Sequence, residues 1–198
     1  MTTSHTSSRL VLASTSPFRK EILAKLGLAF ETASPDIDES PLANETPEQL
    51  VARLAEQKAR AVAERFPDHL IIGSDQVAVI DGAILGKPHS HDRAVEQLSN
   101  ASGKTVRFYT GLCLYNSKTD VSQSEAVPFD VVFRELTASQ IENYLQAEQP
   151  YNCAGSFKSE ALGITLFEKL QGDDPNTLIG LPLIRLVAML EKEGLNPI

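Results

Sequence analysis

The start of the fold is decided by residues 10–23, LVLASTSPFRKEIL, in which an apolar run leads directly into an expected helix. Ser16 is expected to cap this helix and Pro17 to be its first residue, because proline has no N–H to lose at that position. The N–H groups of the helix start, the hydroxyls of Ser14 and Ser16 and the Arg19 guanidinium are all hydrogen-bond donors. Such a donor set suits phosphate oxygens. An ordinary strand-to-helix turn with a surface arginine is the alternative, and the segment alone favours neither.

Apolar periodicity along the rest of the chain predicts a mixture of helices and strands. Thr46 and Gln49 fit a capping box, and Asp81 followed by Gly82 fits a two-residue hairpin turn. Helices are expected at 16–27, 47–66, 91–100, 138–147 and 182–194. Strands are expected at 9–13, 28–33, 69–80, 83–88, 104–116, 121–135 and 163–172. Together these elements indicate an α/β or α+β fold around a mixed sheet.

The bulk composition excludes several classes of protein. We expect the 198 residues to form one domain over 9–198, preceded by a disordered polar tail over 1–8. The net charge is -8 and lysine and arginine form no dense cluster, which argues against a nucleic-acid duplex as partner. No apolar run is long enough to cross a membrane, and MTTSHTSS lacks the apolar core of a signal peptide. Cys113 and Cys153 fit reduced, buried thiols, so a cytoplasmic protein is expected.

Asp75 is the strongest candidate for a catalytic residue. It interrupts the apolar segment IIGSDQVAV, where a carboxylate is costly to bury unless it pairs with a cation or a metal. A bulge at Gly73, Ser74 and Asp75, in which the aspartate caps local N–H groups, is the alternative, and we favour the functional role. Glu39, in the acidic loop PDIDES, either faces solvent or converges with Asp75 on a hard divalent cation.

Two lysines are candidate ligands of phosphate. Lys58 lies on the apolar face of its helix, where a lysine often extends along the edge of the core. Lys87 follows the expected hairpin in LGKP, where it fits an ordinary turn residue as well. For both side chains the sequence leaves the structural and the phosphate-binding alternatives open.

Taken together, these segments resemble the Maf family of nucleoside triphosphate pyrophosphatases. The matching segments are ASTSPFR, the DE of DIDES, the lysine of AEQKA, IIGSDQ, GKP, CAGSFKSEALG and DPNTLIGLP, in the family's order and near its spacing. Within the family the chain is most similar to the YceF-type branch, whose members hydrolyse 7-methyl-GTP. The resemblance implies an elongated mixed α/β fold with a deep central cleft, similar to that of the ITP pyrophosphatases. Members of the family are often dimeric, so a homodimer is one expected assembly.

The resemblance also implies a role for each matching polar residue. Glu39 and Asp75 would hold a divalent cation (Mg²⁺, Mn²⁺ or Co²⁺), and Asp75 would accept the proton of the attacking water. The positions tied to substrate choice would be Phe18, Gln76 and Glu160. The triphosphate would be held by Ser14, Ser16, Arg19, Lys58 and Lys87.

The chemistry of 7-methylguanine supports the same branch. Methylation at N7 gives the base a positive charge, which is attracted to an aromatic face by about 0.5–2 kcal/mol and to a nearby carboxylate. If both residues line the base pocket, Phe18 supplies the aromatic face and Glu160 supplies the carboxylate. The 7-methyl-GTP branch is associated with tryptophan where this chain has Phe18, so the ring available for stacking is smaller here.

Two other functions fit the same residues. One is a pyrophosphatase of the same family that acts on dTTP or UTP. The other is a nucleotide-binding regulator of cell division without catalysis. The intact set of charged residues favours an enzyme, because a binder would not need Asp75 free to accept a proton.

Overall fold

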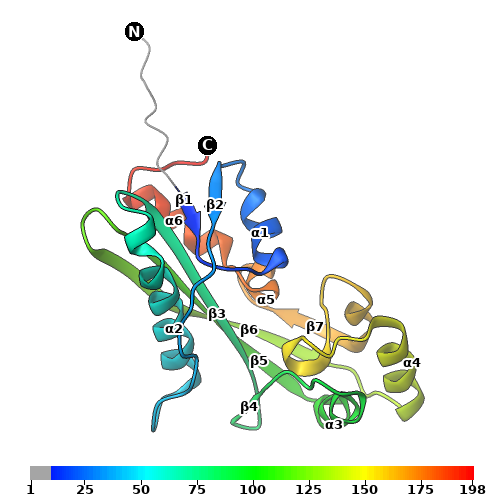
Figure 1. Ribbon diagram of the computed structural model, residues 1–198. Coiled ribbons are helices and arrows are strands. Elements are labelled where there is room, and N and C mark those ends of the chain that lie inside the picture. Colours follow the sequence, from blue (N-terminus) through cyan, green and yellow to red (C-terminus); the bar gives the residue numbers. More distant parts are fainter. Residues whose placement is uncertain (1–9) are drawn as a thin grey trace.

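The computed structural model describes residues 10–198, which contain one seven-stranded mixed sheet (Figure 1). The strand order is β2-β1-β3-β5-β6-β7, with β4 paired to β3. β1 (Leu10–Leu12) runs parallel to β2 (Phe30–Thr32) and to β3 (Leu70–Ile80). The remaining pairings are antiparallel and involve β4 (Ala83–Leu85), β5 (Thr105–Asn116), β6 (Val121–Phe133) and β7 (Phe167–Gln171). The tail predicted over 1–8 lies outside the described residues.

Helices flank this sheet, which confirms the predicted mixed α/β class. They are α1 (Pro17–Ala24), α2 (Pro47–Ala61), α3 (His91–Ala101), α4 (Ala138–Glu148), α5 (Pro175–Ile179) and α6 (Leu183–Lys192). Ser16 caps α1 as predicted, and Thr46 and Gln49 form the predicted capping box of α2. Within residues 10–198, no helix combines the length and apolar character that a bilayer crossing requires.

The alternation of side chains along the strands divides the core into layers. Odd-numbered residues of β1 and β3, such as Val11 and Ile71, pack with α2. Even-numbered residues, such as Leu12 and Ile72, pack with α1 and α6 on the opposite face. Successive residues of a strand point to opposite faces. Adjacent polar residues in β3 therefore face different helices.

Two glycines allow α2 to lie very close to the sheet. A Cβ atom on Gly73 of β3 would overlap the carbonyl oxygen of Ala55, and one on Gly111 of β5 would overlap that of Val51. The obstacle in both cases is helix backbone, which cannot move aside as a flexible side chain can. This close approach brings the last turns of α2 directly over β3.

Several element boundaries differ from those predicted. The first helix ends at Ala24 rather than at Gly27, and α2 ends at Ala61, followed by a 3-10 turn at Ala63–Arg65. The strand expected over 163–172 forms only over Phe167–Gln171, because Leu162–Leu166 is a 3-10 turn. α5 was not predicted at all.

Candidate functional site

The turn after β1 is built from serine hydroxyls that accept backbone hydrogen bonds. Oγ of Ser14 accepts from the N–H of Ser16 at 3.1 Å, and Oγ of Ser16 accepts from the N–H of Arg19 at 3.4 Å. These bonds confirm the predicted cap and orient both side chains at the start of α1. The turn leaves Thr15 and Phe18 exposed and Ser14 buried.

Arg19 crosses from α1 to the segment after α5, and Figure 1 shows these two helices side by side. Its Nε donates to the carbonyl oxygen of Gly180 at 2.8 Å, and the Ser74 hydroxyl donates to the same oxygen at 2.9 Å. A Cβ atom on Gly180 would lie 3.2 Å from that Nε, so the bare glycine makes room for the guanidinium. Burial lowers the pKa of Arg19, while Asp75 and Glu39 oppose this effect, and an arginine remains charged in proteins.

Lys58 joins the two candidate metal-binding carboxylates. Its Nζ lies 2.6 Å from Oδ1 of Asp75 and 2.9 Å from Oε1 of Glu39. Lys58 and Asp75 are only 7% and 8% exposed, whereas the Glu39 side chain is 58% exposed. Glu39 and Asp75, 36 positions apart in the sequence, therefore meet at one ammonium group.

These contacts bear on three of the structural alternatives that the sequence left open, those for Asp75, Glu39 and Lys58. β3 pairs with β5 in continuous register through Gly73, Ser74 and Asp75, so the expected alternative of a bulge is wrong. Glu39 is not a freely solvated loop residue, because it pairs with Lys58. Lys58 does not extend along the core edge to solvent but ends at buried Asp75.

A cavity of about 470 Å³ gathers all the residues predicted to hold phosphate or metal. Its lining also includes Ser34 and Pro35 from the segment after β2. The predicted residues that line it are Ser14, Ser16, Arg19, Glu39, Lys58, Asp75 and Lys87. The lining therefore combines three positive groups with two carboxylates, which Lys58 contacts directly, around a space large enough for a polyphosphate.

A second cavity, of about 340 Å³, adjoins the first and contains the residues predicted to determine substrate choice. Phe18, Gln76 and Glu160 all line it, and Arg19 and Lys87 line both cavities. Phe18 is 39% exposed, so its ring is available for stacking. Gln76 also lines the first cavity, and the side-chain alternation of β3 turns Asp75 toward α2 and Gln76 toward α5.

The segment that carries Glu160 is anchored to α4 at both of its ends. The N–H of Lys158 donates to the Tyr144 hydroxyl at 3.1 Å, and Nζ of Lys158 donates to Oε1 of Glu148 at 3.1 Å. The N–H of Leu162 donates to the other Glu148 oxygen at 3.2 Å. Glu160 lies between these anchors and is itself exposed. These hydrogen bonds hold both ends of the loop against α4, and Glu160 lines the second cavity from between them.

Residues 9–193 match the family model described as Maf-like protein. The chain belongs to the Maf family. One relative, the 7-methyl-GTP pyrophosphatase of Nitrosococcus oceani, is 63% identical over 185 residues, which cover 93% of this chain and 93% of that protein.

Solved structures resemble the fold of this Maf protein. The Ham1 protein of Staphylococcus aureus gives a TM-score of 0.55 at 14% identity, over 94% of this chain and 100% of that one. A HAM1 protein from Coxiella burnetii gives 0.53 at 14% identity, over 93% and 99% of the two chains. At this identity the likeness concerns the fold alone. The deep central cleft implied by the family resemblance stays a prediction.

Sequence reasoning missed the part of this Maf site that comes from α5. The carbonyl groups of Thr177, Leu178 and Gly180 accept hydrogen bonds from Gln76, Ser74 and Arg19. A signal for α5 is present in the sequence, because Asp174 followed by proline is a typical cap and first helical residue. The use of its carbonyl groups leaves no sequence signal.

The two carboxylates of the site, Glu39 and Asp75, fit a hard divalent cation that is bound together with substrate. Among residues 10–198, no three histidine, cysteine or acidic side chains gather into a complete metal-binding cage. Mg²⁺ usually takes one or two carboxylates and completes its shell with substrate phosphates and water. Glu39 and Asp75 supply those two carboxylates, and the ammonium that they share marks a position favourable for positive charge.

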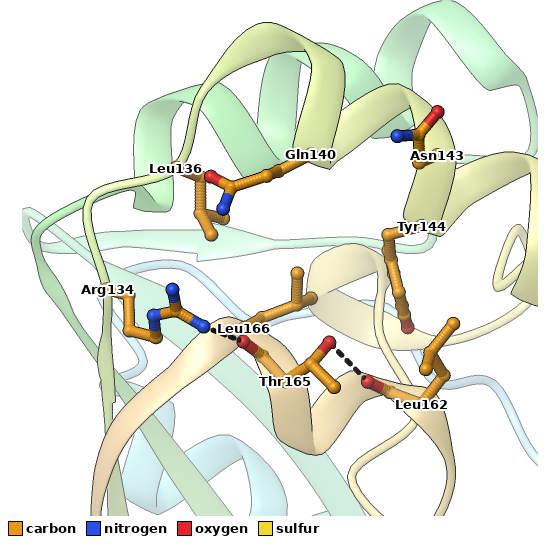
Figure 2. Close-up of a pocket in the computed structure, with 8 residues that line it drawn as sticks. All are labelled: Arg134, Leu136, Gln140, Asn143, Tyr144, Leu162, Thr165 and Leu166. Carbon is orange, nitrogen blue, oxygen red and sulfur yellow. Dashed lines mark hydrogen bonds between the residues drawn. The ribbon is translucent and has the colours of Figure 1, made fainter.

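A third cavity, of about 240 Å³, lies between α4 and the 3-10 turn Leu162–Leu166 (Figure 2). Arg134 is its charged residue, and Nη1 of Arg134 donates to the carbonyl oxygen of Thr165 at 2.9 Å. The Thr165 hydroxyl in turn donates to the carbonyl oxygen of Leu162 at 2.8 Å. These bonds close the turn, and none of the predicted site residues lines this cavity. The candidate site therefore stays at the two cavities that the predicted residues line.

Proposed function

We propose that this Maf protein hydrolyses 7-methyl-GTP to 7-methyl-GMP and diphosphate with the help of a divalent cation. The identity of 63% with a protein named 7-methyl-GTP pyrophosphatase supports the substrate. The observation that carries the chemistry is the convergence of Glu39 and Asp75 on Lys58 inside the phosphate-sized cavity.

The first step is neutralisation of the triphosphate. Arg19 and Lys87 line both cavities, so they lie along the path from the base to the phosphates. Lys58 adds a buried positive charge, and the hydroxyls of Ser14 and Ser16 add donors at the start of α1. A site with this charge pattern attracts a polyphosphate in spite of the protein's net charge of -8.

Hydrolysis requires a water molecule to attack the α-phosphorus. The new bond joins the water oxygen to that phosphorus, the bond to the bridging oxygen breaks, and diphosphate leaves. Asp75 accepts the proton of the water, because its carboxylate is held in place by Lys58 and lines the same cavity. When bound at Glu39 and Asp75, a divalent cation supplies charge stabilisation and a more acidic water.

The base occupies the second cavity in this proposal. Phe18 offers an aromatic face and Glu160 a carboxylate, and both favour the cationic 7-methylguanine over a neutral pyrimidine. This chain has phenylalanine at position 18, where the 7-methyl-GTP branch is associated with tryptophan. We therefore expect weaker stacking but the same preference for 7-methylguanine.

The experiment is a panel of substrates with the purified protein. Diphosphate release from 7-methyl-GTP, GTP, UTP and dTTP is compared in the presence of Mg²⁺, Mn²⁺ or Co²⁺. We expect 7-methyl-GTP to give the highest kcat/KM and EDTA to abolish release. A preference for UTP or dTTP would assign the protein to another substrate of the family. Nucleotide binding without release under any metal would instead support a binding protein.

A further inference from the structure

The orientation of the Gln76 side-chain amide is fixed by three acceptors. Its Nε2 lies 2.9 Å from Oγ1 of Thr110, 2.9 Å from the carbonyl oxygen of Thr177 and 3.1 Å from that of Leu178. Gln76 and Thr110 are direct partners in the register of β3 and β5. α5 supplies the two carbonyl groups to this same face of the sheet.

The Thr110 hydroxyl cannot act as a donor to Gln76. It donates its only proton to the carbonyl oxygen of Thr177 at 2.9 Å, so its oxygen is left to accept. A reversed amide would place the Gln76 oxygen against two carbonyl oxygens and a hydroxyl without a free proton. Thr110 and Thr177 are both 0% exposed, so water cannot compensate for such a mismatch.

The amide therefore has only its carbonyl oxygen left for the base cavity. The Glu160 carboxylate, which lines the same cavity, is also an acceptor when ionised. Guanine carries two neighbouring donors on its pairing edge, N1–H and the 2-amino group. Adenine carries an acceptor, N1, at the centre of that edge. A cavity lined by acceptors thus matches guanine and opposes adenine.

We propose that Thr110 and the carbonyl groups of α5 hold Gln76 with its oxygen toward the base cavity, so that the cavity selects a guanine-type base over an adenine-type base. This inference rests on the proposed function, because it takes the second cavity as the base site. Gln76 contacts the base, and Thr110 is a positioning residue that acts through Gln76. A site built to receive an N–H rejects the analogue without one, because its acceptor is then left unpaired.

Calorimetric titration of GTP and ATP in the presence of EDTA tests the inference without any turnover. Wild-type protein should bind GTP at least about tenfold more tightly than ATP, as expected for one matched hydrogen bond against one unpaired group. Gln76→Met keeps the length of the side chain, loses this acceptor and should strongly reduce the preference, with Glu160 as the acceptor that remains. Thr110→Val should reduce the GTP-to-ATP ratio by about the same factor. Thr110→Ser keeps the hydroxyl and should retain the ratio.

A purely structural role for Thr110 would change a different quantity. It would lower the melting temperature, or the affinity for both nucleotides equally, and leave the GTP-to-ATP ratio unchanged. An unchanged ratio in Thr110→Val, or equal affinities in the wild type, overturns the inference. If Thr110→Val does not fold, the GTP-to-ATP ratio of Gln76→Met is the test, because Gln76 is only partly buried and its replacement should be tolerated. A ratio in Gln76→Met equal to that of the wild type overturns the inference.

The proposed function is checked separately by diphosphate release from 7-methyl-GTP with Mg²⁺. A wild-type protein that prefers GTP to ATP but releases no diphosphate would overturn the function and leave base selection standing. A protein that releases diphosphate but shows no such preference would overturn base selection alone.

Discussion

The ammonium nitrogen of Lys58 lies 2.6 Å from Oδ1 of Asp75, and both residues are buried. The same nitrogen lies 2.9 Å from Oε1 of Glu39. One lysine of α2 therefore joins a strand carboxylate to a loop carboxylate. This arrangement holds the proposed proton acceptor in position before any substrate binds.

Asp75→Asn should abolish turnover of 7-methyl-GTP and leave the fold intact. A lost general base costs about 10²–10⁴-fold in rate, and the amide keeps the size of the side chain. We expect kcat to fall by this factor while the protein still folds, because the amide oxygen can still accept from Lys58 and Glu39 remains an ionic partner of that lysine. Asp36→Asn, an exposed carboxylate in the loop that carries Glu39, is the matched control and should remain active. Near-full activity of Asp75→Asn would show that another group accepts the proton.

Lys58→Met should destabilise the protein because it leaves Asp75 buried without its partner. Breaking a buried ion pair from one side costs about 3–5 kcal/mol in the free energy of unfolding. The double variant Lys58→Met/Asp75→Asn should recover part of this loss, and urea unfolding measures both. Lys104→Met is the control, because it breaks the exposed pair with Asp81, for which about 0–1 kcal/mol is expected. Equal losses in the two lysine variants would contradict the prediction.

Gly73→Ala should push α2 away from β3. The added methyl group meets the carbonyl oxygen of Ala55, and overpacking of this kind costs at least about 1–3 kcal/mol. Activity should fall as well, since Lys58 on α2 moves relative to Asp75. Gly86→Ala is the matched control, because a Cβ there meets nothing within 4 Å. Thermal unfolding of the two variants compares them directly, and a Gly73→Ala protein as stable as Gly86→Ala would refute the close packing.

Glu45→Gln should lower stability in a pH-dependent way. Nε of Arg53 donates to Oε1 of Glu45 at 2.6 Å, and this hydrogen bond is the largest cause that lowers the pKa of Glu45 to about 2. Because the folded pKa lies below the ordinary value of 4.5, the stabilisation is complete above pH 4.5 and is lost as the pH falls toward 2. The difference in melting temperature between wild type and Glu45→Gln should therefore shrink across that window. A difference that is constant from pH 2 to 7 would contradict the assignment.

The same arginine links this ion pair to the site. Nη2 of Arg53 also donates to the carbonyl oxygen of Ser40, next to Glu39, at 3.1 Å. Glu45→Gln should therefore also raise the metal concentration needed for half-maximal activity. Glu64→Gln, a change at an exposed acidic residue beyond α2, should leave that concentration unchanged.

Glu148→Ala should loosen the segment that carries Glu160. It removes the carboxylate acceptors for Lys158 and for the N–H of Leu162, whereas the phosphate cavity is untouched. We expect KM for 7-methyl-GTP to rise several-fold, by an amount typical of one or two lost hydrogen bonds, with kcat little changed. Gln146→Ala serves as control, because this residue is exposed and its side chain bonds Glu142 within the same helix. A fall in kcat without a change in KM would mean that the loop does not act through base binding.

Local signals in the sequence were sufficient for most elements. The cap at Ser16, the capping box at Thr46 and the hairpin at Asp81 and Gly82 were all predicted correctly, because each depends on neighbouring residues only. The strand predicted over 163–172 was wrong in its first half. There the tight approach of Gly163 to the carbonyl group of Lys158 belongs to a 3-10 turn, and that contact is not encoded in β-propensity.

By itself, the sequence determined the mixed class of the fold, the helix caps and the identity of the charged residues that form the site. Only the tertiary structure decided that Glu39 and Asp75 share one lysine and that Thr110 and α5 hold the amide nitrogen of Gln76. Both outcomes depend on how closely α2 and α5 approach opposite faces of β3. That approach is set by packing and by buried hydrogen bonds between segments distant in the chain, which no local pattern of residues contains.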